Sequence, residues 1–329
     1  MRRTFLKAAC AAAVGFAVAI PVSAAEFNFK FGHAQPATSV RHKSMELFKE
    51  KLEKESNGRI SVSLFAAGSL GNEAELTDMV KMGTVQGTRG GAFAKANKKF
   101  LIYTLPFLFS DTESVLKAMR SDFGSAVGKH AEANGYYIPA TGVAGGFRQI
   151  TNNKKPINTP EDVAGLKIRT PPIETIVKTM QALGGNPQSI SYGETYMALK
   201  MGVVDGQENP PSNIVEMKFY EAQKYLSIVD YQIHPDPLMV NLKWYQSLPN
   251  DLKTVFNKVA KEAMEWSDTR WLASEAGYMA TLKEKMTVNT ISPENRAKFV
   301  TKVKPVWDAY VKDGTFTEAE IQAALKAAK

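Results

Sequence analysis

Apolar and polar positions alternate with two different periods along this chain. Residues 27–31 alternate between phenylalanine and polar residues, and the same period of two returns at residues 60–64, so each segment is predicted to form a β-strand. Between them, apolar residues at positions 45, 48 and 52 have helical spacing, and Asn57-Gly58 is typical of a left-handed helix end. Strands that alternate with helices predict an α/β fold.

Later segments continue the same alternation. Asn72-Glu73-Ala74-Glu75 resembles a capping box at the start of a helix, and Gly83 is a suitable end for it. The remaining predictions in this part of the chain are a strand around Ile168, a helix from Pro171-Pro172 to Gly184-Gly185, a strand at 189–191, a helix near 194–201, a strand at 203–204, a polar turn at 205–210 and a helix from about 213 to 226.

One stretch near the carboxyl end predicts an unusually long helix. From Pro249 to Met286 there is no further proline and only one glycine, Gly277. A helix of about 35 residues is about 50 Å long, so it would lie across two domains. A helical hairpin broken near Gly277 is the alternative. Thr317 and Glu320 predict a capped last helix.

Residues 1–25 have the pattern of a secretory signal peptide. Arg2 and Arg3 precede an apolar stretch from Ala8 to Ile20, and Val22-Ser23-Ala24 is a small-x-small cleavage pattern. The apolar stretch is short for a membrane span, which needs about 20 residues, so cleavage is favoured over a permanent anchor. The paired arginines also fit a twin-arginine motif, which leaves the export route open. The mature protein is expected in the periplasm.

Composition narrows the class further. Cys10 is the only cysteine and lies in the signal, so the mature chain is expected to contain no disulfide and no thiolate site. About 300 mature residues can bury the cores of two domains. The net charge of +8 falls to +5 without Arg2, Arg3 and Lys7, and the basic residues form no stripe, which argues against nucleic acid as a partner.

Patterns of catalytic or metal chemistry are missing from the sequence. It has no G-x-S-x-G elbow, and the segment GSAVGKH at 124–130 lacks the spacing of a phosphate loop. The four histidines show no metal-ligand spacing, and paired acids such as Glu161-Asp162 are typical of helix starts. We therefore expect a protein that is not an enzyme and needs no cofactor or metal.

Two arginines point to a different chemistry. Arg169 follows the apolar residues of a short predicted strand, at the carboxyl end where ligands of open α/β sheets gather. A guanidinium binds a carboxylate through two parallel hydrogen bonds and keeps its charge at any physiological pH. Arg148 and the amide of Asn209 are the neighbouring candidates, although Asn beside Pro is also a common turn and capping residue.

Several segments in order resemble one family. The quoted runs are GGFRQITNNKKPINTPEDVAGLKIRTPP, LGGNPQSISYGETYMALKMGVVDGQENPPSNI, FYEAQKYLS, NGRISVSLFAAGSLGNEAEL, TLPFLF and VNLKWYQSLP. Together they resemble the DctP-type substrate-binding proteins of tripartite ATP-independent periplasmic (TRAP) transporters, over nearly the whole mature chain. The resemblance implies an α/β periplasmic binding protein fold with a central cleft between two domains. It implies domain I at 26–145 plus about 236–276, and domain II at 146–235 plus about 277–329.

The resemblance also implies a function and a set of site residues. Such proteins close around an organic acid and deliver it to TRAP membrane subunits. Arg169 corresponds to the main salt bridge to the ligand carboxylate, with Arg148 and Asn209 beside it. Tyr192 corresponds to an aromatic that packs on the ligand, although an ordinary core position is an equal alternative. Asn72 and Glu73 belong to a loop that faces the ligand from the other domain.

Two positions depart from the family pattern. Arg89 stands where an acid is common, and is either a second counter-charge in the cleft or a solvated residue at a strand end. The histidine that often follows the YLS segment is replaced by Asp230 and Tyr231, so His234 carries no weight as a site residue. A receptor that presents its ligand to a signalling protein is the alternative function, and an enzyme is the more distant one.

Overall fold

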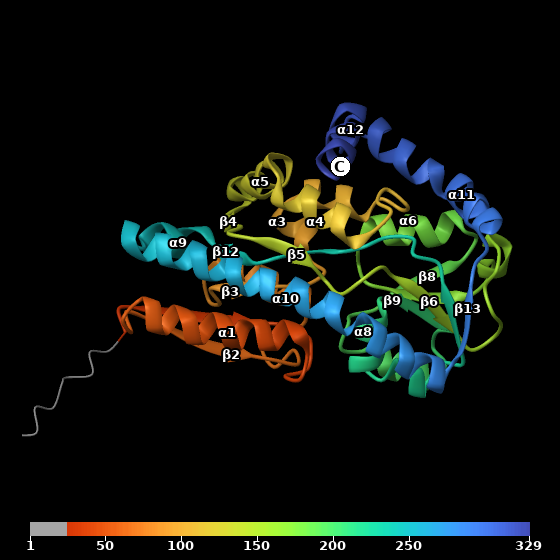
Figure 1. Ribbon diagram of the computed structural model, residues 1–329, viewed down its shortest axis with the longest axis horizontal. Helices are drawn as coiled ribbons and strands as arrows, with labels where there is room; N and C mark the ends of the chain where they lie inside the picture. The colour runs from red at the N-terminus through yellow and green to blue at the C-terminus, as the bar shows by residue number, and fades with distance from the viewer. Residues whose placement is uncertain (1–24) are drawn as a thin grey trace, which may run out of the picture.

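Two β-sheets, each covered by helices, lie side by side in the molecule (Figure 1). The computed structural model describes residues 25–329, so the predicted signal peptide and Cys10 lie outside the described residues. None of the helices within these residues is both long and apolar enough to cross a bilayer.

The first sheet has five strands in the order β2-β1-β3-β12-β4. β1 is parallel to β2 and β3, whereas β12 runs antiparallel to its neighbours β3 and β4. Alternating phenylalanines of β1 point into a core that α1 and α10 also line. The strands are β1 (Phe27–Gly32), β2 (Ile60–Phe65), β3 (Gly87–Thr88), β4 (Tyr136–Tyr137) and β12 (Met239–Asn241).

The second sheet has six strands in the order β13-β10-β6-β9-β7-β8. β6 runs antiparallel to both of its neighbours, and the other adjacent pairs are parallel. The strands are β6 (Gln149–Asn152), β7 (Lys167–Thr170), β8 (Asn186–Ser189), β9 (Gly206–Asn209), β10 (Tyr225–Ile228) and β13 (Thr287–Thr290). The first sheet and this one therefore take their strands from alternating parts of the chain.

Helices and short turns of 3-10 helix cover the sheets. They are α1 (Val40–Glu55), α2 (Glu73–Met82), α3 (Phe93–Ala96), η1 (Lys98–Thr104), α4 (Thr112–Arg120), α5 (Asp122–Lys129), η2 (His130–Asn134), η3 (Pro160–Val163), α6 (Glu174–Ala182), α7 (Thr195–Lys200), α8 (Pro211–Glu216), η4 (Phe219–Glu221), α9 (Leu242–Ser247), α10 (Asn250–Lys285), α11 (Pro293–Lys312) and α12 (Glu318–Ala327). α11 packs on α6 beside the second sheet, and α12 returns to lie against α4 and α5 (Figure 1). The carboxyl-terminal tail therefore bridges parts of the chain that the predicted domain boundaries separate.

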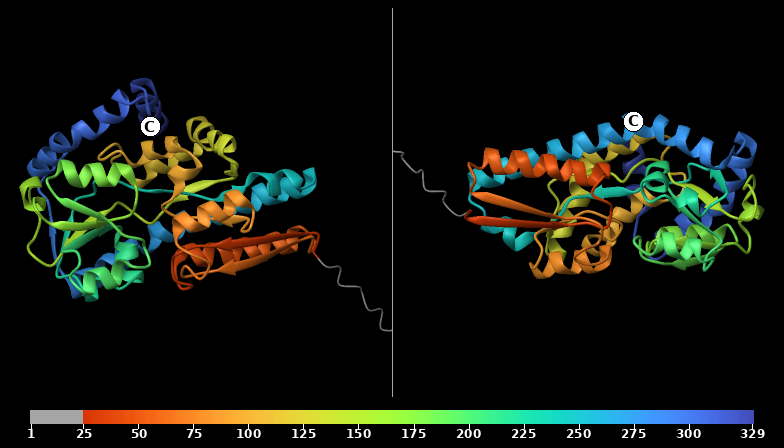
Figure 2. Two further views of the ribbon diagram at one scale, coloured as in Figure 1. Left: turned by 180° about the vertical axis from the view of Figure 1, so that it is seen from behind. Right: turned by 90° about the horizontal axis from the view of Figure 1, so that it is seen from below.

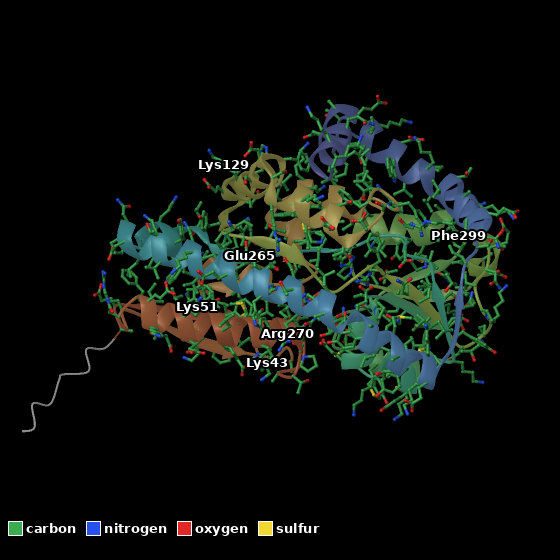
Figure 3. The ribbon with its side chains drawn as sticks, viewed as in Figure 1. Lys43, Lys51, Lys129, Glu265, Arg270 and Phe299 are labelled. Carbon is green, nitrogen blue, oxygen red and sulfur yellow. The ribbon has the colours of Figure 1, made fainter. Side chains whose placement is uncertain are left out.

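The chain passes between the sheets three times. Two crossings, β5 (Thr141–Val143) and β11 (Pro235–Pro237), pair antiparallel in a ribbon of their own. The third is α10, a single helix of 36 residues that runs from one sheet to the other (Figure 2, right). α10 packs along α1 through apolar side chains, and the pairs Lys51–Glu262 and Lys258–Glu55 flank that contact, with Lys51 labelled in Figure 3.

Most of the predicted elements are present. The strands at 27–31 and 60–64 are confirmed, as are the helix ends at Asn57-Gly58 and at Gly83, all three residues having positive φ. Asn72 accepts from the backbone N–H groups of Ala74 and Glu75, so the capping box is confirmed. The last helix has the predicted Thr317–Glu320 box.

α10 is continuous through Gly277, so the hairpin alternative is wrong.

Two predictions were wrong between residues 205 and 226. The polar segment at Gly206–Asn209 is not a turn but the buried strand β9, because partners from neighbouring elements hydrogen-bond its polar side chains. The helix predicted to reach Leu226 ends at Glu216, since Lys218 has a positive φ of 55°. Tyr225–Ile228 then pairs with β6 and β13 as a strand. The strand predicted at 189–191 ends at Ser189. The strand predicted at 203–204 was wrong, since Val203 and Val204 lie in the turn before β9.

Two buried aspartates hold the crossing ribbon in place. Asp236 of β11 binds both Arg41 of α1 and Arg89, which follows β3. Asp268 of α10 accepts the N–H of Val143 in β5 at 2.9 Å and binds Arg120 of α4 at 2.8 Å. The ribbon is thus tied to the long helix and to the helices of the first sheet.

We expect Asp268 to make stability depend on pH between 4 and 6. Burial raises the pKa of its carboxyl from 3.8 to about 6, although Val143 N–H and Arg120 oppose this. The folded protein therefore holds this proton more tightly than the unfolded chain, and the stabilisation is lost as pH rises through about 6. Relative to Asp268→Asn, the free energy of unfolding should fall by about 2.4 kcal/mol between pH 4 and pH 7. Urea unfolding of both proteins measures this, and a constant difference would contradict it.

Candidate functional site

A small cavity lies between the two sheets and is lined from both sides. Arg148, Arg169 and Asn209 come from the second sheet, whereas Gln35 and Arg41 follow the first strand of the other. The cavity has a volume of about 30 Å³. That is room for roughly two water molecules, so the walls must separate before a larger molecule enters.

Arg169 is a buried cation without a salt-bridge partner among the described residues. It occupies β7 near its carboxyl end and is 1% exposed. Its Nε donates to the carbonyl of Ile190 at 2.9 Å, and its buried Nη2 has no partner. It makes no salt bridge within residues 25–329. Burial lowers the pKa of Arg169 to about 10, with Arg148 adding to the effect and Glu208 opposing it.

Arg148 has a carboxylate partner of its own. Its Nη2 donates to Oε1 of Glu208 at 2.7 Å and to the Glu208 carbonyl at 2.6 Å, and its Nε also donates to this carboxylate. The hydroxyl of Tyr231 donates to Glu208 at 2.5 Å. Burial acts to lower the pKa of Arg148, but Glu208 outweighs it and the pKa is raised. Arg148 is thus fixed in place and largely neutralised.

Amide side chains connect the two sides of the cavity. The Nη2 of Arg148 donates to Oδ1 of Asn209 at 3.2 Å, and Nδ2 of Asn213 donates to the same oxygen at 3.0 Å. Gln35 donates to Oδ1 of Asn213 at 3.3 Å, which links the loop after β1 to α8. The Oε1 of Gln35 is buried and has no partner. Asn209 ends β9 and does not cap α8, whose N-cap is Pro210.

Glu73 supplies a carboxylate from the first-sheet side. It begins α2, its side chain is 18% exposed, and it lies 3.6 Å from Nη1 of Arg41. A Cβ atom added at Gly90 would come within 2.5 Å of the Glu73 carboxylate, and one at Gly91 within 3.0 Å. The two glycines therefore allow the carboxylate to lie against the backbone after β3. Arg41 is further engaged by Asp236, at 3.2 Å.

Tyr192 and His234 complete the wall. The ring of Tyr192 packs 6.3 Å from that of Phe219, and its buried hydroxyl has no partner. Burial raises the pKa of this hydroxyl, so it is protonated at neutral pH. His234 lies between Gln232 and Arg148, 3.4 Å from Nη1 of the latter. Burial and the neighbouring arginines keep its pKa well below 6.5, so the imidazole is neutral.

The structure brings together most of the residues that the sequence singled out. Arg169, Arg148, Asn209, Tyr192 and Glu73 all line this cavity. Asn72 does not line it, and its side chain caps α2. Arg89 does not line the cavity either: it lies behind the wall at 0% exposure, where it binds Asp236 and Ser44, so it matches neither alternative, the counter-charge in the cleft or the solvated residue.

Four polar or charged lining residues were missed by the sequence reasoning. They are Gln35, Arg41, Asn213 and His234. Gln35 and Arg41 follow the carboxyl end of β1, and the rule that selected Arg169 could have found them there. His234 was set aside because its position departs from the family pattern. No sequence signal distinguished Asn213, because an asparagine in the first turn of a helix is common.

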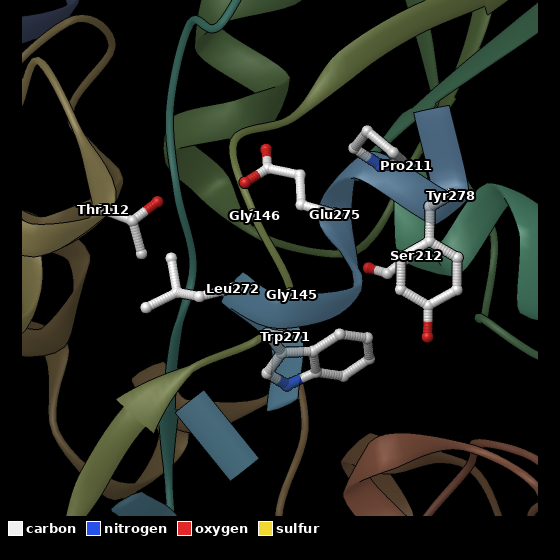
Figure 4. Close-up of a pocket in the computed structure, with 9 residues that line it drawn as sticks. All are labelled: Thr112, Gly145, Gly146, Pro211, Ser212, Trp271, Leu272, Glu275 and Tyr278. Atoms are coloured by element: carbon white, nitrogen blue, oxygen red, sulfur yellow. The ribbon is translucent and has the colours of Figure 1, made fainter. Parts of the chain in front are cut away.

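A second cavity lies at the joint between α10 and the crossing segments (Figure 4). Trp271, Glu275 and Tyr278 of α10 face Gly145-Gly146 and Ser212 across it. Its volume is about 10 Å³, which is no more than one water molecule occupies. Buried Nε1 of Trp271 and Oγ of Ser212 have no partner there, but no arginine lines it. Of these two cavities, the one around Arg169 is therefore the candidate binding site.

The sequence profile of one family matches this chain over most of its length. Bacterial extracellular solute-binding protein family 7, or DctP, matches residues 31–313. The chain belongs to this family. The resemblance seen in the sequence segments is thereby confirmed.

Relatives of known structure or name agree with this assignment. The C4-dicarboxylate-binding periplasmic protein DctP of Vibrio cholerae is 30% identical over 322 residues, which is 94% of each chain. The sugar acid binding protein DctPAm of Advenella mimigardefordensis, solved in complex with galactonate, has a TM-score of 0.86 at 27% identity and covers 92% of this chain and 97% of its own. A TRAP periplasmic solute binding protein of Sulfurospirillum deleyianum with bound succinate has a TM-score of 0.86 at 26% identity, covering 93% and 100%. The predicted two-domain periplasmic binding protein fold is confirmed.

The two central arginines of this DctP-family chain should respond in opposite ways to the same substitution. Arg148→Met leaves Glu208 buried without its guanidinium, so the free energy of unfolding should fall by about 3 to 5 kcal/mol. Arg169→Met removes a buried cation that has no acidic partner, so the ligand-free protein should be as stable as the wild type or more stable. Urea unfolding of both variants measures the difference. An equal decrease in the free energy of unfolding of both variants would contradict this prediction, because it would indicate that Arg169 also has an acidic partner.

Proposed function

We propose that this protein is a periplasmic receptor that binds an organic acid by its carboxylate at Arg169. The observation that carries the proposal is a buried guanidinium that lines a cavity, has an unpartnered Nη2 and makes no salt bridge within residues 25–329. A buried charge without a partner is unfavourable, and a ligand carboxylate supplies that partner. The DctP family consists of substrate-binding receptors, and we propose that this member performs no catalysis.

Neighbouring groups have supporting roles in this proposal. Arg148 is held in place by Glu208, and its Nη1 faces His234. Asn209 fixes Arg148 and Asn213 through its oxygen. Tyr192 offers an aromatic face and a hydroxyl free to donate. A ligand carboxylate would thus meet donors already held in place, which reduces the entropy lost on binding.

We infer domain closure from the fact that the cavity is lined by residues from both sides of the molecule. Arg169 and Arg148 belong to the second sheet, whereas Gln35, Arg41 and Glu73 belong to the first-sheet side. A ligand that contacts both sides favours the closed arrangement by the contacts it makes only there. We propose that residues 26–145 with about 236–276 move relative to residues 146–235 with about 277–329, although the contacts of α12 with α4 and α5 must adapt.

Delivery of the ligand is the last step of the proposed function. The succinate-bound structure among the relatives is a TRAP periplasmic solute binding protein, so the membrane subunits of a TRAP transporter are the proposed partners. Presentation of the ligand to a signalling protein has no specific support from the described residues.

A thermal-shift screen of mono- and dicarboxylates, keto acids, aromatic acids and sugar acids tests the binding site. An acid at 100 times its dissociation constant should stabilise the wild type by about 2.7 kcal/mol. Arg169→Met should weaken binding of the same acid by at least about 30-fold, because the loss of a buried charged partner costs about 2 kcal/mol or more. Undiminished affinity in this variant, at unchanged stability, would refute the proposed site.

Small-angle X-ray scattering tests the closure. The radius of gyration of the wild type should decrease when a bound acid is added, since the contacts to both sheets hold them together. Arg169→Met at the same acid concentration is the control and should show no decrease. An acid that binds the wild type tightly without compaction would contradict the proposed motion.

A further inference from the structure

The buried charged groups around the cavity carry a net charge of one positive unit. Two of its three lining arginines already have acidic partners, Arg148 in Glu208 and Arg41 in Asp236 and Glu73. Arg89 must be counted as well, because it shares Asp236 with Arg41. The four buried guanidinium groups are then balanced by three carboxylates, those of Glu73, Glu208 and Asp236, and one positive charge is left over. The next acid, Glu216, does not line the cavity, and its carboxylate accepts from the N–H of Val40 and the hydroxyl of Tyr278. A monoanion therefore neutralises the site.

Glu73 places a negative charge on the wall opposite the leftover cation. Arg169 comes from β7 of the second sheet, whereas Glu73 begins α2 beside the first. The carboxylate is held against Gly90 and Gly91, where any larger residue would push it away. A ligand anchored on Arg169 that reaches across the cavity thus meets Glu73 with its far end. A second carboxylate there would face a like charge, which is unfavourable.

The remaining unpartnered groups also favour a hydrogen-bond donor at the far end. The buried Oε1 of Gln35 has no donor and lies on the same side of the cavity as Glu73. Both groups accept hydrogen bonds, and the hydroxyl of Tyr192 can donate or accept. Ligand hydroxyl groups would satisfy these acceptors without adding charge. An ammonium group would satisfy them too, but a zwitterion would leave the positive charge of the site uncompensated.

We propose that Glu73 determines specificity, and that this receptor selects monocarboxylates bearing hydroxyl groups over dicarboxylates. The inference rests on the proposed function, because it takes Arg169 as the anchor of the first carboxylate. It sets this chain apart from its relative with bound succinate, whose ligand carries two carboxylates. Glu73 does not hold the acid in this scheme. It repels a second carboxylate at the far end of the ligand and accepts a hydrogen bond from a hydroxyl group there.

Pairs of acids that differ only at the far end test the inference. Suitable pairs are 4-hydroxybutanoate with succinate, and gluconate with glucarate, measured by isothermal titration calorimetry at pH 7.5. In the better-bound pair, the hydroxy acid should bind the wild type at least about tenfold more tightly than the dicarboxylate, which corresponds to 1.4 kcal/mol. A third probe, 4-aminobutanoate, carries an ammonium on the same four-carbon chain and should bind less tightly than 4-hydroxybutanoate.

Glu73→Gln separates the charge of this side chain from its shape. The variant keeps a hydrogen-bond acceptor but removes the negative charge. The preference for the hydroxy acid over the dicarboxylate should therefore decrease by about tenfold or more. Glu75→Gln is the matched control, because it removes an acid from the same first turn of α2, does not line the cavity and keeps a residue suited to the capping box. Its ratio should equal that of the wild type.

The outcomes distinguish this inference from the function on which it rests. A wild type that prefers the dicarboxylate, or a ratio unaltered by Glu73→Gln, would overturn the role of Glu73 while leaving a carboxylate receptor. Tighter binding of 4-aminobutanoate than of 4-hydroxybutanoate would replace hydroxy acids by amino acids as the substrate class. Absence of binding by every acid tested would overturn the proposed function, and this inference with it.

Discussion

Burial of guanidinium groups is the constraint on which the arrangement of this molecule depends. Arg41, Arg89, Arg148 and Arg169 are all at most 3% exposed, and a buried cation requires a compensating charge. Asp236 meets this need for Arg41 and Arg89, and so ties the crossing ribbon to the first sheet. Glu208 meets it for Arg148 within the second sheet. Arg169 alone of these four makes no salt bridge within residues 25–329, which is why we propose it as the anchor of the ligand carboxylate.

Local sequence signals predicted the elements whose ends are fixed by their own residues. The capping boxes that begin α2 and α12 and the left-handed ends at Asn57-Gly58 and Gly83 depend on a few adjacent positions, which the sequence displays. The failure at Gly206–Asn209 has the opposite cause. Polar residues can form a central strand only when distant side chains such as Thr151, Arg148 and Tyr231 bind them, and no local pattern reveals those partners.

The same contrast applies to the site. Arg169 could be predicted because it stands at the end of a recognisable strand, and its neighbours followed from the family resemblance. The pairing of each arginine could not be predicted, since Asp236 and Arg41 are 195 residues apart and meet only in the folded protein. For this reason Arg89 was placed in the cleft or in solvent, when it in fact serves the structure behind the wall. Which cation remains unpaired is a property of the fold rather than of the sequence.

The continuous helix α10 constrains how the molecule can move. α10 is one continuous helix of 36 residues, and Asp268 fastens the ribbon strand β5 to it about midway. If the two sheets move relative to each other, as we propose, we expect a rotation about a line close to that attachment, because α10 and the ribbon both cross between the sheets there. We expect α10 and the crossing ribbon to determine the path of closure, whichever acid is bound. Different acids would then produce one common outer shape, and a membrane partner could recognise occupancy without reading the ligand.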